Sequence, residues 1–136
     1  MNEAEQISSL LKSAHSIAVV GISADPLRPS YDVAAYLQRQ GYRIIPVNPA
    51  LSEVLGEKCY AALKDVPASE RIDVVDIFRR PEFVPAIVDE AIARGGIGAI
   101  WMQDGVVHEA AAARARQAGM TVIMDQCMLR EHRRRR

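Results

Sequence analysis

Two segments of the chain carry residue types that can bind phosphate. The first is the glycine turn Gly21-Ile22-Ser23, which leads through Arg28-Pro29-Ser30-Tyr31 into an apolar helical pattern. Backbone N–H groups at the start of such a helix can hold a phosphate group. The second is the pair Arg79 and Arg80, because guanidinium groups fit phosphate oxygens with two hydrogen bonds. A cation at a helix start opposes the helix dipole, so two interpretations of this pair stay open: contact with a bound anion, or solvated residues at the helix start.

Other candidate site residues also follow predicted strands. Phe78 directly precedes the two arginines, and its ring can contact an adenine or an aliphatic arm. Gln103 and the backbone of Gly105 follow the apolar run Ala99–Met102 and can line a cleft. In a parallel sheet the carboxyl ends of the strands meet at one edge, where ligands bind.

The turn after the first strand lacks most of a dinucleotide fingerprint. That motif has three glycines, G-x-G-x-x-G, and here only Gly21 is present, with Ser23 in place of the second glycine. The next strand ends in Val47-Asn48-Pro49, where NAD enzymes carry an acidic residue that accepts from the ribose. Asn48 is compatible with a nucleotide whose ribose carries a phosphate, which a carboxylate would repel. The P-loop motif G-x-x-x-x-G-K-[ST] is also missing, so the sequence does not support P-loop NTP hydrolysis.

No arrangement of catalytic or metal-binding side chains is recognisable. The three histidines have no metal-ligand spacing with one another or with Cys59 and Cys127. No nucleophile has a visible base beside it in the pattern. We therefore expect no catalytic residue and no metal site. Two interpretations of Cys127 stay open: a small buried hydrophobe, or a thiol that faces the ligand.

The elements that must position these residues alternate between strands and helices of about ten residues. Strands are predicted near residues 16–20, 43–47, 73–78, 99–102 and 121–124, with a short strand near 58–59. Helices are predicted for residues 3–14, 31–40, 81–94 and 108–117, and Ser30 is a candidate cap of the second helix. Pro46 indicates that its strand lies at an edge of the sheet, because proline cannot donate to the ladder.

This pattern predicts the α/β class, with one Rossmann-like domain over residues 1–136. We expect three layers and a mostly parallel sheet of about five strands in the order 3-2-1-4-5. Residues 1–15 form an N-terminal helical segment, and residues 130–136 a basic tail, interpreted as disordered and solvated.

Charge and hydropathy exclude several classes of protein. Lys plus Arg and Asp plus Glu both number 17, so net charge indicates neither a nucleic-acid nor a membrane partner. No apolar run approaches the roughly 20 residues that span a bilayer. The acidic start of the chain is unlike a signal peptide, so a cytoplasmic location with reduced cysteines is expected.

Taken together, the segments at the strand ends resemble a known family. They include Val19-Val20-Gly21-Ile22-Ser23, Arg28-Pro29-Ser30-Tyr31, Gly41-Tyr42-Arg43-Ile44-Ile45-Pro46-Val47-Asn48-Pro49, Gly56-Glu57-Lys58, Val75-Asp76-Ile77-Phe78-Arg79-Arg80 and Trp101-Met102-Gln103. In this order they resemble the small stand-alone CoA-binding proteins of the YccU-like type. These in turn are similar to the CoA-binding domain of the succinyl-CoA synthetase α subunit.

The resemblance implies a Rossmann-like fold that binds coenzyme A. It places phosphates at Gly21–Ser23 and Arg28–Tyr31, the adenosine part between Val47 and Pro49, and nucleotide or phosphate at Phe78–Arg80. Gln103 and Gly105 would lie along the pantetheine arm. The chain departs from the family at Asp104, where relatives often have Leu, and at Gln126, where they often have Arg.

The resulting hypothesis is non-catalytic binding of CoA or acyl-CoA by a sensor or carrier module, without nucleic acid or membrane. Two alternatives stay open. One is a small NAD(P)-dependent oxidoreductase, and the other is a protein that keeps the fold only for interaction with a partner. The sequence does not indicate which protein partner, or which acyl group, is involved.

Overall fold

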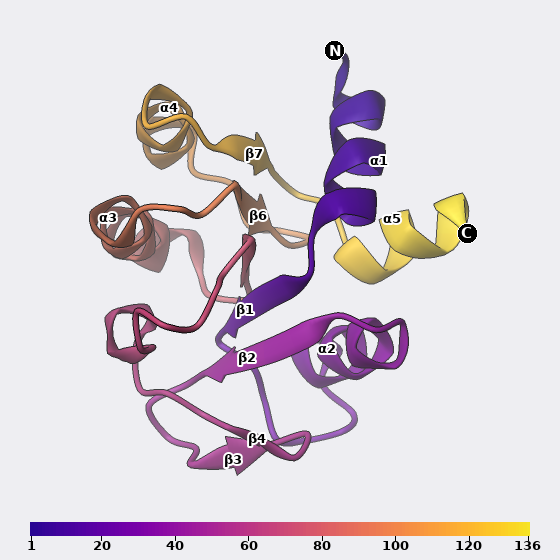
Figure 1. Ribbon diagram of the computed structural model, residues 1–136, viewed down its shortest axis with the longest axis vertical. Coiled ribbons are helices and arrows are strands. Elements are labelled where there is room, and N and C mark those ends of the chain that lie inside the picture. Colours follow the sequence, from indigo (N-terminus) through magenta and orange to yellow (C-terminus); the bar gives the residue numbers. More distant parts are fainter.

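A parallel sheet of five strands runs through the centre of the computed structural model, which describes residues 1–136 (Figure 1). In sheet order the strands are β2 (Arg43–Val47), β1 (Ser16–Val20), β5 (Val74–Ile77), β6 (Ala99–Met102) and β7 (Thr121–Ile123). Every neighbouring pair is parallel. All five carboxyl ends therefore lie at one edge of the sheet.

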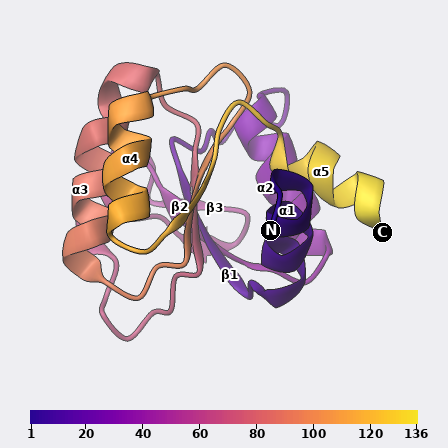
Figure 2. The same cartoon turned by 90° about the horizontal axis from the view of Figure 1, so that it is seen from above.

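Helices cover both faces of this sheet (Figure 2). On one side lie α1 (Glu3–Ser13), α2 (Pro29–Arg39) and α5 (Met128–Arg135). On the other side lie α3 (Val84–Arg94) and α4 (Glu109–Gln117). The remaining elements are the hairpin β3 (Glu53–Val54) and β4 (Glu57–Lys58) and the short 3₁₀ turns η1 (Leu63–Asp65) and η2 (Pro81–Phe83). The predicted three-layer, Rossmann-like fold is confirmed.

The central strands are apolar because both of their faces are covered. All five residues of β1 and all four of β5 and of β6 are buried. Alternate side chains enter two separate clusters: Ala18 and Val20 pack under α3 and α4, whereas Ile17 and Val19 pack under α1, α2 and α5. A continuous apolar run is the pattern that a parallel strand buried on both faces requires.

The strand order differs from the prediction at one edge. Among the five strands the observed order is 2-1-3-4-5, so β5 pairs with β1 and not with β2. Outside β2 there is only one parallel bridge, between Val47 and Tyr60, where Tyr60 N–H donates to the Pro46 carbonyl at 3.0 Å. Because the Pro46 carbonyl points outward, its missing N–H lies on the outer edge and removes no bond to β1. The prediction that Pro46 lies on an edge strand is confirmed.

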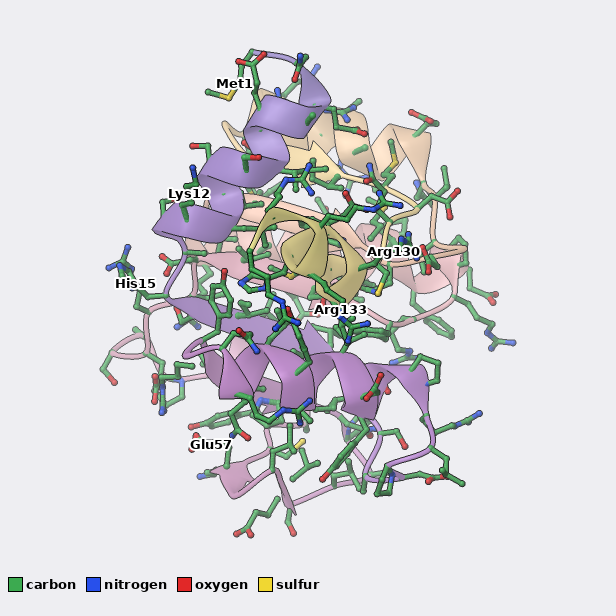
Figure 3. The ribbon with its side chains drawn as sticks, turned by 90° about the vertical axis from the view of Figure 1, so that its right-hand side faces the viewer. Met1, Lys12, His15, Glu57, Arg130 and Arg133 are labelled. Carbon is green, nitrogen blue, oxygen red and sulfur yellow. The ribbon has the colours of Figure 1, made fainter.

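The predicted basic tail is instead the helix α5, which packs between α1 and α2 (Figure 3). Met128 and Leu129 are buried in the core on this side of the sheet. Tyr36 and His132 share a hydrogen bond of 2.7 Å between the Tyr36 oxygen and His132 Nδ1. The buried Glu131 receives ion pairs from Arg134 and Arg135 at 2.9 and 3.0 Å. The interpretation of this segment as disordered was wrong, since Met128, Leu129 and His132 have partners elsewhere in the fold.

One polar side chain in the core has no partner. Asp76 occupies the middle of β5, between Val19 of β1 and Trp101 of β6, and is completely buried. Neither of its carboxylate oxygens has a hydrogen-bond partner. Burial away from water raises the pKa of Asp76 well above its ordinary value.

None of the helices has both the length and the apolar composition that crossing a bilayer would require.

Candidate functional site

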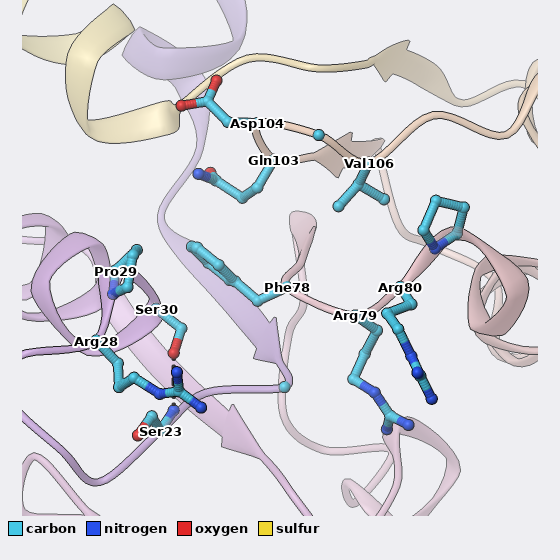
Figure 4. Close-up of a pocket in the computed structure, with 13 residues that line it drawn as sticks. Ser23, Arg28, Pro29, Ser30, Phe78, Arg79, Arg80, Gln103, Asp104 and Val106 are labelled. Atoms are coloured by element: carbon cyan, nitrogen blue, oxygen red, sulfur yellow. Dashed lines mark hydrogen bonds between the residues drawn. The ribbon is translucent and has the colours of Figure 1, made fainter.

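A cleft of about 440 Å³ lies at the carboxyl ends of β1, β5 and β6 (Figure 4). It is lined by Gly21, Ser23, Arg28, Pro29, Ser30, Phe78, Arg79, Arg80, Pro81, Gln103, Asp104, Gly105 and Val106. This is the edge where the predicted site residues were expected to meet, because neighbouring strands end there.

Gly21 allows two strand ends to approach each other closely. It has a φ of +90°, and a Cβ at this position would lie 2.6 Å from the Phe78 carbonyl oxygen and 2.9 Å from Arg79 Cδ. Only glycine is free of both the conformational strain and the contact. The turn after β1 and the arginine segment after β5 are therefore placed side by side.

The turn is tied to the first turn of α2 through two serines. Ser23 N–H donates to Ser30 Oγ at 2.9 Å, and Ser23 Oγ accepts from Asp25 N–H at 2.9 Å. Ser30 was expected to cap the helix, but α2 begins at Pro29, with Arg28 before it and no side-chain cap. Its hydroxyl orders the turn instead.

Several donors in this turn are not used by the protein. The backbone N–H groups of Ile22, Ala24 and Ser30 donate to no protein acceptor. Each of the hydroxyls of Ser23 and Ser30 accepts a bond and keeps its own hydrogen for a further acceptor. Unpaired donors beside a helix N-terminus form an anion-binding arrangement.

The arginines add positive charge to the same part of the cleft. Arg28 and Arg79 form no salt bridge with any carboxylate of the protein, whereas Arg80 pairs with Glu82 at 3.2 Å. The Arg79 guanidinium lies 4.1 Å from the centre of the Phe83 ring. This stacking holds the cation in position and leaves its N–H groups available to an anion.

The wall formed by the end of β6 is held by the segment that precedes and begins α5. Gln103 Oε1 accepts from Met128 N–H at 3.1 Å, so its amide nitrogen remains available as a donor. Gly105 N–H donates to Asp125 Oδ1 at 2.7 Å and is therefore already used. Asp104 forms two hydrogen bonds with Arg130, of 2.9 and 3.0 Å. These bonds lower the pKa of Asp104 below its ordinary range, against the effect of partial burial.

The structure brings together around the cleft ten of the fifteen predicted site residues, all except Ile22, Tyr31, Val47, Asn48 and Pro49. Asn48 has a structural contact instead: its amide donates to the Ile22 carbonyl at 2.7 Å, and its Oδ1 accepts from Ala50 N–H at 2.8 Å. Asn48 thus supports the Gly21–Ser23 turn from behind. The binding roles of all fifteen residues stay predictions.

Three lining residues are not among those fifteen, namely Pro81, Asp104 and Val106, although Asp104 and Val106 belong to the segment that follows the predicted strand 99–102. Each directly follows a predicted residue in the chain, so the signal was their position after a strand end.

No cysteine or histidine lines the cleft. Cys127 is the half-buried N-cap residue of α5 and packs against the core. His108 Nδ1 accepts from Ala111 N–H at 3.1 Å and so caps α4.

Comparison with known proteins gives consistent matches. The family described as CoA binding domain matches residues 15–133. The uncharacterized protein YneT of Bacillus subtilis is 39% identical over 127 residues, which are 93% of this chain and 92% of YneT. The ADP-forming acetate–CoA ligase II of Archaeoglobus fulgidus is 30% identical over 96 residues, 69% of this chain and 14% of the ligase. The solved structure of a hypothetical protein from Pyrococcus horikoshii has a TM-score of 0.91 at 38% identity, covering 98% of this chain and 92% of that one.

Proposed function

Because this chain belongs to the CoA binding domain family, we propose that it binds coenzyme A in the cleft at the ends of β1, β5 and β6. Coenzyme A has a diphosphate and a ribose phosphate at one end. An uncharged pantetheine arm extends from them and ends in a thiol. The ligand thus needs anion donors at one part of its site and a neutral wall at another.

The observation that carries this proposal is the pair of unpaired arginines beside the serine turn. Arg28 and Arg79 have no carboxylate partner, and the N–H groups of Ile22, Ala24 and Ser30 have no protein acceptor. A protein surface with cations and donors left in this state is favourable for a phosphate-rich ligand. Asn48, in place of an acidic residue at the end of β2, supports a nucleotide with a phosphate on its ribose rather than NAD.

We infer a binding module rather than an enzyme. The lining residues of the cleft include no nucleophile with a base within reach, which acyl transfer would need. The matched part of the acetate–CoA ligase is 14% of that protein, so ligase chemistry is not carried over with the match. A carrier or sensor of CoA or acyl-CoA is the role that the cleft supports best.

Calorimetric titration of the protein with CoA, dephospho-CoA and NAD tests this proposal. We expect CoA to bind most tightly, dephospho-CoA more weakly because it lacks the ribose phosphate, and NAD most weakly. Raising the salt concentration should weaken CoA binding, since the attraction is between charges. Binding of NAD in preference to CoA, or no heat and no retained CoA on gel filtration, would contradict the proposal.

A further inference from the structure

The wall of the cleft formed by the end of β6 carries the only carboxylate among the lining residues, that of Asp104. In Figure 4 it lies across the cleft from Arg28 and Arg79. The cleft therefore has unpaired cations at the ends of β1 and β5 and no free cation after β6, where the Asp104 carboxylate is turned toward Arg130 of α5. The low pKa of Asp104 keeps this carboxylate ionised at neutral pH.

Each of the three guanidinium nitrogens of Arg130, the partner of Asp104, lies beside a carboxylate of the protein. Both terminal nitrogens of Arg130 bond to the two oxygens of Asp104, and Arg130 Nε lies 3.7 Å from Glu131 Oε2. A further anion would therefore compete with Asp104 and Glu131 for this guanidinium. The ion pair is partly exposed, with 56% of the Asp104 side chain and 43% of Arg130 accessible, so it contributes little to folding stability.

The direction of coenzyme A in the cleft follows from this polarity, and this step rests on the proposed function. The phosphates are most favourable beside Arg28 and Arg79. The uncharged arm then extends along Gln103, whose amide nitrogen can donate to an amide carbonyl of pantetheine, and along the apolar Val106. The thiol, or an acyl group attached to it, would reach the wall that holds Asp104.

We propose that the Asp104–Arg130 pair makes this site selective for CoA and uncharged acyl-CoA against acyl groups that carry a free carboxylate. Such an acyl group would bring its negative charge toward ionised Asp104, while Arg130 is already engaged. Like charges that face each other disfavour binding, and they give specificity more than affinity. A short uncharged acyl group meets no such repulsion.

The experiment compares CoA, acetyl-CoA and succinyl-CoA as ligands of the wild-type protein, of Asp104→Asn and of Asp89→Asn. Asp89 pairs with the Arg114 side chain between α3 and α4, away from the cleft, so its variant controls for the loss of an exposed Asp–Arg pair. The wild-type protein should bind acetyl-CoA as tightly as CoA and succinyl-CoA about tenfold more weakly, which is about 1.4 kcal/mol. In Asp104→Asn, Arg130 is free to pair with the succinyl carboxylate. The ratio of acetyl-CoA to succinyl-CoA affinity should then fall to about threefold or less, which is about 0.7 kcal/mol. Asp89→Asn should keep the wild-type ratio.

The outcomes separate this inference from the function on which it rests. Equal affinity of the wild-type protein for acetyl-CoA and succinyl-CoA overturns the inference and leaves CoA binding intact. An unchanged ratio in Asp104→Asn, with thermal unfolding showing an intact fold, also overturns it. Failure of all three ligands to bind overturns the proposed function and this inference together.

Discussion

The backbone N–H of Ser23 donates a hydrogen bond of 2.9 Å to Oγ of Ser30, and this bond joins the turn after β1 to the start of α2. Two serines seven residues apart thereby determine where the unpaired donors of the turn point. The arrangement of these donors depends on a side chain inside the helix rather than on a cap before it.

Ser30→Ala should therefore weaken CoA binding although the hydroxyl is only one of several donors. The change removes the acceptor of Ser23 N–H and should lower the free energy of unfolding by about 1 kcal/mol. Urea denaturation and CoA titration measure the two effects. Ser9→Ala, on the exposed side of α1 and without a side-chain hydrogen bond, is the control. Wild-type CoA affinity in Ser30→Ala would mean that the turn does not need this bond.

Gly21→Ala should be more damaging than an equivalent change at Gly41. Both glycines have positive φ, +90° and +102°, so alanine is strained at either position. A Cβ at Gly21 would also meet the Phe78 carbonyl, whereas at Gly41 no atom lies within 4 Å. We expect Gly21→Ala to cost about 1–3 kcal/mol more in unfolding free energy, the usual range for overpacking. Equal losses in the two variants would show that the turn can move away from Phe78.

Arg28→Ala and Arg79→Ala should each weaken CoA binding by about tenfold or more, because a hydrogen bond to a charged group contributes about 1.5–3 kcal/mol. Arg39→Ala, an exposed arginine at the end of α2 that has no salt bridge, should bind CoA like the wild type. The variants should also show a smaller dependence of affinity on salt than the parent. If either cleft variant retained wild-type affinity, that arginine would not contact the ligand.

Asp76 predicts an unusual pH dependence of stability. Since burial raises its pKa in the folded state, the folded protein holds a proton that the unfolded chain releases near pH 4. Its contribution to stability is therefore greatest below about pH 4 and is lost as the pH rises toward the raised folded pKa. The amide side chain introduced by Asp76→Asn does not titrate. The unfolding free energy of this variant should therefore rise relative to that of the wild-type protein between pH 4 and pH 7. A constant difference across that range would mean that Asp76 is ionised in the fold.

Acetyl-CoA should not be hydrolysed by the protein. Thioester cleavage needs an activated nucleophile, and Cys127, the thiol that the sequence left open as facing the ligand, packs against the core and does not line the cleft. Thiol release from acetyl-CoA should match the rate without protein, and intact mass should show no CoA adduct. Release above that background which disappears in Cys127→Ser would show that the binding module is also a catalyst.

Local patterns in the sequence determined most of the fold. The run Ile17–Val20 and the similar runs after it predicted buried parallel strands because a strand covered on both faces must be apolar throughout. Pro46 predicted the sheet edge because an absent N–H is tolerated only there. The order of the strand-end segments from Val19 to Gln103 led to the CoA-binding family. Each of these signals depends on neighbouring residues or on a residue's own backbone chemistry.

The tertiary structure decided the features that depend on residues far apart in the chain. The sequence predicted that Arg130 lies in a solvated basic tail. In the fold α5 packs between α1 and α2, and Arg130 bonds to Asp104, which is 26 residues away in the sequence. The same is true of Asp76. The residues near it in the sequence do not indicate that it lies between Val19 and Trp101 in the sheet. Ion pairs and burial are set by distances in space, and an amino-acid sequence specifies those distances only through the packing of the whole chain.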